Sequence, residues 1–178
     1  MVFDRILKRA AHRAALFLFV CCVAMTLSVT LSRQALAKMR IDQLQIEPAA
    51  GGQTRTFEIE VADSEQEKAL GLMFRTKVGD GEGMLFFYGP EREISMWMHN
   101  TYIPLDMLFI RADGVIHRIE VKAEPLSDRV ISSGGPIAAV LELPGGAAEK
   151  LGIKAGDRVR HGVFGAPGAP SQPVAPAY

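Results

Sequence analysis

The sequence predicts a single, mainly β domain, built as a sandwich or small barrel of about seven strands with two short helices. Two observations carry this prediction. Apolar residues recur with a period of two along much of the chain between residues 57 and 164, and helical patterns are confined to two short stretches. An alternating α/β sheet is not expected, because that architecture needs a helix between successive strands.

The predicted strands differ in how deeply they are buried. Residues 57–61 alternate apolar and acidic side chains, which is typical of a half-buried strand, whereas residues 83–88 are apolar on both faces, which is typical of a fully buried one. The other predicted strands are residues 94–98, 104–111, 115–122, 138–143 and 158–164.

The two predicted helices have clear start and stop signals. Ser64 and Glu67 form a capping box, in which each side chain bonds the backbone N–H of the other residue at the first helical turn. The second helix spans residues 144–151, and Gly152 ends it because glycine adopts the left-handed conformation at a helix C-terminus.

Residues 1–37 have the pattern of a signal peptide. Four basic residues precede an uncharged run at residues 14–31, and Ala-Leu-Ala at residues 35–37 offers a cleavage site. We therefore predict a mature domain at residues 38–164 in the periplasm or secreted. The alternative is an uncleaved anchor that holds the domain on the periplasmic side of the inner membrane, since the uncharged run almost reaches bilayer length. Membrane contact is expected only through this segment.

Composition excludes several classes of site. Both cysteines, Cys21 and Cys22, lie in the leader, so the mature domain has neither disulfides nor thiolate metal sites. Five of the 20 basic residues and one of the 20 acidic residues also lie there, which leaves the mature chain a net charge of −4 and makes a nucleic-acid partner unexpected. Residues 165–178 are rich in Pro, Ala and Gly, and we expect a disordered tail.

An ordered series of motifs resembles a known family. The series is GLMFR (71–75), GMLFFY (83–88), WMHNTYIPLDM (97–107), LELPGG (141–146) and GIKAGD (152–157). It is similar to the bacterial and archaeal family catalogued as domain of unknown function 192, from about residue 41 to 164, although His99 stands where that family usually has lysine. The resemblance implies an all-β, jelly-roll-like sandwich, often behind a signal peptide, and implies no activity.

The Asp113-Gly114 pair predicts a two-residue hairpin turn that sets which side chains share a face. The expected pairs are Ala112 with Val115, Ile110 with His117, Leu108 with Ile119 and Asp106 with Val121. This register directs Asp106 inward, where a carboxylate needs donors. We expect it to accept N–H groups from residues 100–102 or to pair with Arg75; the alternative is the anionic pole of a pocket. His117 is expected in the core or at its rim.

Trp97 is the most suggestive candidate for binding. Its parity sets it opposite Met96 and Met98, which have the pattern of core residues, so its ring is either covered by a loop or presented as a platform. His99, Asn100 and Thr101 follow at once. This mixture suits a small polar ligand such as a sugar or a peptide end.

Two further charged residues have open roles. Arg75 either binds an anionic ligand or forms a salt bridge to Asp106 or Glu142. Glu142 is expected to face solvent or a cleft, and with Asp106 it has the composition of a glycosidase carboxylate pair, although the sequence gives no separation. The Gly145-Gly146 pair either offers N–H groups to an anion or makes a helix-entry turn.

The favoured function is a non-enzymatic periplasmic binding or interaction module for a small polar or envelope-derived ligand or partner. Its ligand-binding residues would be Arg75, Trp97, His99, Asn100, Thr101, Asp106 and Glu142. The alternatives are an envelope carbohydrate- or peptide-directed hydrolase that uses Asp106 or Glu142 as acid or base, and an envelope assembly factor that recognises only proteins. No cofactor is expected. No metal site is assigned, because the histidines at 99, 117 and 161 lack ligand spacing.

Overall fold

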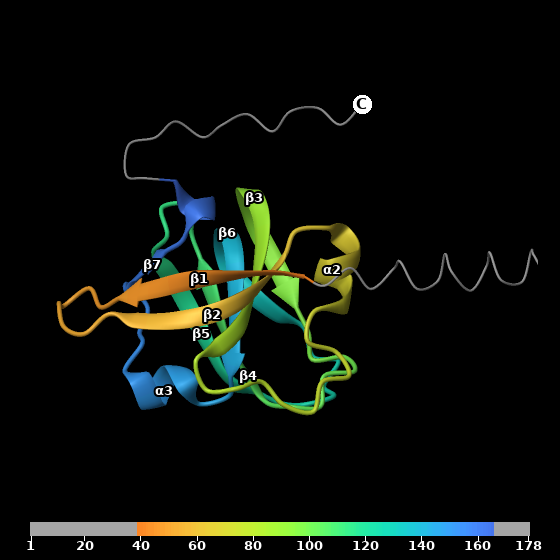
Figure 1. Cartoon of the computed structure of the whole chain (residues 1–178). Coiled ribbons are helices and arrows are strands. Elements are labelled where there is room, and N and C mark those ends of the chain that lie inside the picture. The colour runs from red at the N-terminus through yellow and green to blue at the C-terminus, as the bar shows by residue number, and fades with distance from the viewer. Residues whose placement is uncertain (1–38, 166–178) are drawn as a thin grey trace, which may run out of the picture. The chain divides into compact units, whose positions relative to one another are not determined.

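Seven strands form one sheet in the order β5-β4-β6-β3-β2-β1-β7. The computed structural model describes residues 39–165, so the predicted signal peptide and tail lie outside the described residues, apart from Gly165 (Figure 1). The strands are β1 (Arg40–Glu47), β2 (Arg55–Ala62), β3 (Glu82–Met96), β4 (Leu105–Ile110), β5 (Ile116–Ala123), β6 (Ile131–Pro144) and β7 (Arg158–Arg160). Neighbouring strands are antiparallel, except that β2 and β3 run parallel.

The sheet curls until its two edge strands approach each other. Val115, just before β5, forms an isolated bridge with Arg158 of β7. Two backbone hydrogen bonds support this contact, from Ile116 N–H to Asp157 O at 2.9 Å and from Val159 N–H to Gly114 O at 2.7 Å. Contact between edge strands is what distinguishes a barrel from an open sheet. The small-barrel form of the predicted fold is therefore confirmed.

The central strands β3, β4 and β6 are buried on both faces because a hydrophobic core lies on each side of them. The inner core, enclosed by the curl, includes Leu44, Phe57, Leu85, Leu108 and Leu141. The outer core includes Met84, Phe86, Met98, Met107 and Phe109. Every residue of β4 is accordingly buried.

The strand count was predicted, but not each strand. Residues 83–88 and 94–98 belong to one long strand, β3, whose pairing with β6 is interrupted by irregularities between Phe87 and Arg92 and between Glu93 and Ser95. Strand β1 was not predicted; its side chains alternate between buried and exposed only from Leu44 onward. The last strand is shorter than predicted, because a 3-10 helix occupies Gly162–Phe164.

Both predicted helices are present. In α2 (Glu65–Leu70) the Ser64 hydroxyl accepts from Glu67 N–H, and the Glu67 carboxylate accepts from Ser64 N–H, which confirms the capping box. Helix α3 (Ala147–Leu151) begins later than predicted and ends at Gly152, whose φ of 71° is left-handed as expected.

The predicted two-residue hairpin turn is wrong. Arg111 donates its N–H to Val115 O at 3.0 Å and accepts from Gly114 N–H at 2.9 Å, which makes a three-residue loop. Gly114 has φ of 81°, the left-handed position that closes such loops with a bulge. The extra residue shifts the register that follows it.

The shifted register changes which residues of β4 and β5 pair with each other. Ile110 pairs with Ile116, so the expected Ile110–His117 pair is wrong, although Leu108 and Ile119 pair as predicted. His117 is half-buried with its Nε2 3.4 Å from Gly134 O, at the rim. A second irregularity between Leu105 and Met107 separates Asp106 from Val121, which is exposed.

Candidate interaction surface

Three loops distant in sequence are joined by backbone hydrogen bonds at one end of the domain. Phe74 N–H donates to Asn100 O at 2.9 Å, and Leu126 N–H donates to Thr101 O at 3.0 Å. Met98 N–H reaches Ser127 O at 3.0 Å. Figure 1 shows these loops side by side below α2. We call residues 72–75, 97–102 and 126–130 the aromatic loop surface.

This surface holds most of the large apolar side chains that the described residues expose. Trp97 is 53% exposed and Phe74 is 56% exposed, and they are joined by Tyr102, Leu126 and Val130. The rings of Phe74 and Tyr102 meet edge to face, with centroids 6.2 Å apart. Several exposed apolar side chains on neighbouring loops mark an interaction site more often than a single exposed residue does.

The backbone of these loops is held in unusual conformations. Non-glycine residues rarely adopt positive φ, yet each loop contains one: Phe74 at 62°, Asn100 at 53° and Leu126 at 61°. Lys122 is the remaining such residue in the described part of the chain. Such conformations cost free energy and gather at binding and catalytic sites. The interlocking hydrogen bonds are what hold these three residues in place.

The polar residues that follow Trp97 belong to the same surface. The His99 ring stacks on the indole with centroids 5.0 Å apart, and its Nδ1 lies 2.7 Å from Asp128 Oδ1. Thr101 is buried and donates its hydroxyl to His99 O, so it supports the loop instead of contacting solvent. The structure therefore places Trp97, His99 and Asn100 together at an exposed site, with Thr101 beneath them.

Asp106 lies outside this surface and is fully buried. Its carboxylate accepts backbone N–H groups of Lys122, Gly146 and Ala148, each at 2.8 Å. The acceptor role is the one that the sequence analysis favoured, but both suggested sets of donors are wrong. The Gly146 N–H, which was considered as a donor to an external anion, therefore donates to the Asp106 carboxylate instead.

Glu142 is buried, and the prediction that it faces solvent or a cleft is wrong. It lies in β6 between Met84 of β3 and Met107 of β4, on the face of the outer core. Burial raises the pKa of this carboxyl to about 8 from an ordinary value of 4.5. Its parity was assigned correctly, opposite Leu141 and Leu143, but that face is covered.

Arg75 pairs with neither suggested partner. Its guanidinium binds Glu60 in a two-point fork, with Nη2 2.7 Å from Oε2, and this bond raises the pKa of Arg75. The pair lines a shallow cleft of about 150 Å³ beside β2. Of the predicted site residues, Asp106 and Glu142 therefore lie outside the aromatic loop surface, and Arg75, at its edge, directs its guanidinium to Glu60.

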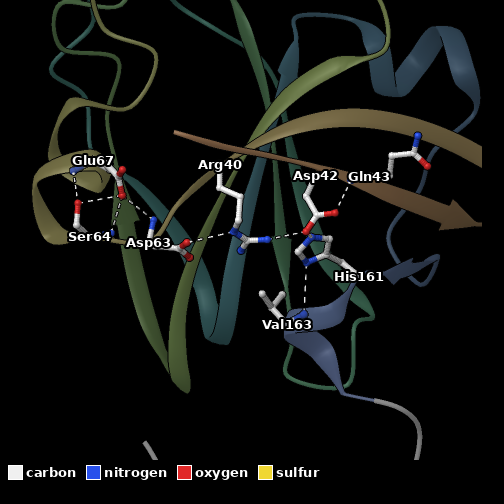
Figure 2. A network of polar contacts seen from close by, with 8 residues as sticks. All are labelled: Arg40, Asp42, Gln43, Asp63, Ser64, Glu67, His161 and Val163. Carbon is white, nitrogen blue, oxygen red and sulfur yellow. Dashed lines mark hydrogen bonds and ion pairs between the residues drawn. The ribbon is translucent and has the colours of Figure 1, made fainter. Parts of the chain in front are cut away.

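A separate polar network lies along β1 (Figure 2). Arg40 bridges Asp42 and Asp63, and Asp42 also lies 3.3 Å from Nε2 of the buried His161 ring. His161 Nδ1 accepts from Val163 N–H at 3.4 Å, which places the ring proton on Nε2, facing Asp42. His161 Nε2 and Asp42 are close, but their geometry is not that of a hydrogen bond. The network fastens the last described turn to the sheet.

Sequence reasoning missed half of the aromatic loop surface. Phe74 and Tyr102 lie within the GLMFR and WMHNTYIPLDM motifs, so their place in the motifs was a usable signal. Leu126, Asp128 and Val130 carry no motif and enter the site only because their loop folds against residues 98–101.

Within residues 39–165 no group of three or more His, Cys, Asp or Glu side chains is placed to hold a metal ion. In the same part of the chain, no helix has the length and hydropathy needed to cross a membrane.

Comparison with known proteins agrees with the motif series. Two solved structures are similar: a protein of Sinorhizobium meliloti 1021 described as a putative transcription regulator, and a protein of unknown function from Novosphingobium aromaticivorans DSM 12444. The first is 38% identical, with a TM-score of 0.69 and coverage of 71% of this chain and 98% of that one. The second is 39% identical, with a TM-score of 0.67 and coverage of 71% and 89%.

No curated protein matches the chain. The model of one protein family matches residues 46–161, a range that includes every motif of the series and all three segments of the aromatic loop surface. The chain therefore belongs to the DUF192 family, described as an uncharacterized ACR.

Proposed function

We propose that this domain is a non-enzymatic binding module whose aromatic loop surface docks on a partner protein. The observation that carries the proposal is the gathering of Phe74, Trp97 and Tyr102, all exposed, on loops whose backbone is fixed in costly conformations. Aromatic side chains contribute most of the binding free energy at many protein interfaces. Rigid loops reduce the entropy lost on binding.

The shape of the surface favours a protein over a small molecule. Small ligands are usually held in concave sites of about 300–1,000 Å³. Neither of two clefts in the described residues, one beside α3 and one beside Arg75, is lined by Phe74, Trp97 or Tyr102. Two polar side chains of this surface already have partners within the domain, His99 with Asp128 and Arg129 with Glu120, so an uncharged, apolar partner surface fits best.

The hydrolase alternative receives no support from the carboxylates suggested for it. The Asp106 carboxylate accepts its three hydrogen bonds from backbone N–H groups, and the residue has no exposure to solvent. Glu142 is only 4% exposed and lies between methionines of the neighbouring strands. Neither carboxylate lines the cleft beside α3 or the cleft beside Arg75, so we do not propose this activity.

We further propose that the module works outside the cytoplasm, in the periplasm. This part of the proposal is supported by the sequence pattern of residues 1–37. An envelope protein would then be the partner.

Site-specific photocrosslinking tests the proposal. A photoreactive phenylalanine analogue replaces Phe74 or Tyr102 in the full chain, and the matched control replaces Val121, which is equally exposed (56%) but lies on β5. We expect one defined protein adduct from both loop positions in the envelope fraction and none from the control. Excess unlabelled chain should suppress the adduct, and excess Trp97→Ala chain should not.

Equal labelling from Val121, or equal competition by Trp97→Ala, would show that the surface does not select a partner. A second measurement addresses a small ligand. Trp97 is the single tryptophan of the chain, so a shift of its emission with soluble cell-wall fragments, in the absence of any adduct, would replace the protein partner by a small polar ligand.

A further inference from the structure

A cleft of about 650 Å³ lies between the start of β2 and helix α3. Its walls come from residues 53–57, from the turn at Asp80 and Gly81, and from residues 144–147, 150 and 151. The volume is within the range of sites for small molecules. We propose that this cleft binds a small organic carboxylate with an apolar body.

Arg55 supplies the first argument. It is half-buried at the wall of the cleft, its Nη1 donates to Gln53 Oε1 at 2.9 Å, and its Nε is buried without a hydrogen-bond acceptor in residues 39–165. Because this Nε is buried, a ligand in the cleft would meet the terminal Nη groups instead. The two Nη groups of a guanidinium form a fork that matches the two oxygens of a carboxylate.

The charge of the cleft gives the second argument. Its charged lining residues are Arg55, Lys150 and Asp80, which sum to a net charge of +1. Lys150 and Asp80 pair at 2.8 Å, and because both side chains are mostly exposed the pair is weak. One net positive charge calls for a ligand with a single negative charge.

The apolar part of the lining sets the rest of the ligand. Phe57, Pro144, Ala147 and Leu151 contribute to the same walls as Arg55. A ligand that places its carboxylate on Arg55 would therefore rest a short hydrocarbon or aromatic group against these residues. Inorganic anions fit this arrangement less well, because they would leave the apolar wall in contact with water.

The test measures amide chemical shifts of the isotope-labelled full chain. Hexanoate, benzoate and N-acetylglycine are the probes, and hexanamide is the uncharged match of hexanoate. We expect saturable shifts at Thr54, Arg55, Gly81 and Leu151 with hexanoate. Hexanamide should bind at least about tenfold more weakly, because it cannot form the charged fork.

Variants complete the test. Arg55→Gln should reduce hexanoate affinity to the level of hexanamide, and Arg55→Lys should restore part of it by returning the charge. Arg111→Gln, on the β4–β5 loop, is the matched control and should bind as the wild type does. The proposal is overturned if no probe shifts the cleft amides at millimolar concentration, if hexanamide binds as well as hexanoate, or if folded Arg55→Gln retains its affinity.

Discussion

Replacing Glu142 by glutamine should make the stability of this domain much less sensitive to pH. Glu142 is 4% exposed, and burial raises its pKa to about 8 from 4.5. Between these two values the folded state keeps the proton and the unfolded state loses it. Stability is therefore greatest below the unfolded pKa and falls as the pH rises toward the folded pKa. Above it, the domain holds a buried charge.

The size of the effect follows from the pKa difference. Each unit of difference corresponds to about 1.4 kcal/mol, so release of this proton on unfolding lowers the free energy of unfolding, relative to low pH, by on the order of 3 kcal/mol at about pH 7 and 4 kcal/mol at about pH 8. The neutral amide of Glu142→Gln has the shape of the protonated acid and never ionises. The advantage of the variant should grow by roughly 3–4 kcal/mol between about pH 5 and pH 8.

Urea denaturation followed by circular dichroism measures this difference at several pH values. Glu58→Gln is the matched control, because Glu58 is an exposed glutamate on β2 and its replacement should leave the pH dependence unchanged. Parallel stability curves for wild type and Glu142→Gln would refute the reasoning. They would mean that the carboxylate gains enough solvation in the folded state to ionise near its ordinary pKa.

Three further predictions follow from other residues. Asp106→Ala should lower the free energy of unfolding by at least about 2 kcal/mol, because three backbone donors lose their acceptor, and Asp106→Asn should lower it less. Thermal or urea unfolding measures both, and an unchanged melting temperature would contradict the structural role. Trp97→Ala should lower the free energy of unfolding by much less than the roughly 3–5 kcal/mol lost when a core aromatic site is emptied. Acrylamide should quench the fluorescence of Trp97 in the wild type, and a blue-shifted, unquenched emission would show a covered ring. N-terminal sequencing of envelope material should begin at Lys38, whereas an intact Met1 on membrane-bound protein would favour the anchor.

Local patterns predicted the features that depend on neighbouring residues. The capping box at Ser64, the stop at Gly152 and the half-buried strand around Ile59 all follow from interactions within a few positions of the chain. The exposure of Trp97 has the same origin, because Ile94 and Met98, which share the opposite parity, turned out to be core residues. Alternation along a strand is fixed by backbone geometry, so it can be predicted without knowing the fold.

The same parity could not decide what covers a face. Leu141 and Leu143 were placed correctly against Glu142, yet Glu142 is buried because β3 and β4 flank it and the outer core lies over it. Asp106 was expected to need donors, but Gly146 and Ala148 lie about 40 positions away in sequence. Which distant segments bury a side chain, and which distant N–H groups donate to it, cannot be predicted from the local pattern of residues.

Register and loop contacts belong to the tertiary structure for a related reason. A single added residue in the Asp113-Gly114 loop moved Ile116 into the place expected for His117, and turn chemistry alone did not distinguish the two loop lengths. The aromatic loop surface needed three segments to meet, one of them without any motif. The sequence by itself determined most of the strand segments, the helix ends at Ser64 and Gly152, and the outward direction of Trp97. Only the tertiary structure decided which residues join it, because long-range backbone hydrogen bonds hold those loops together.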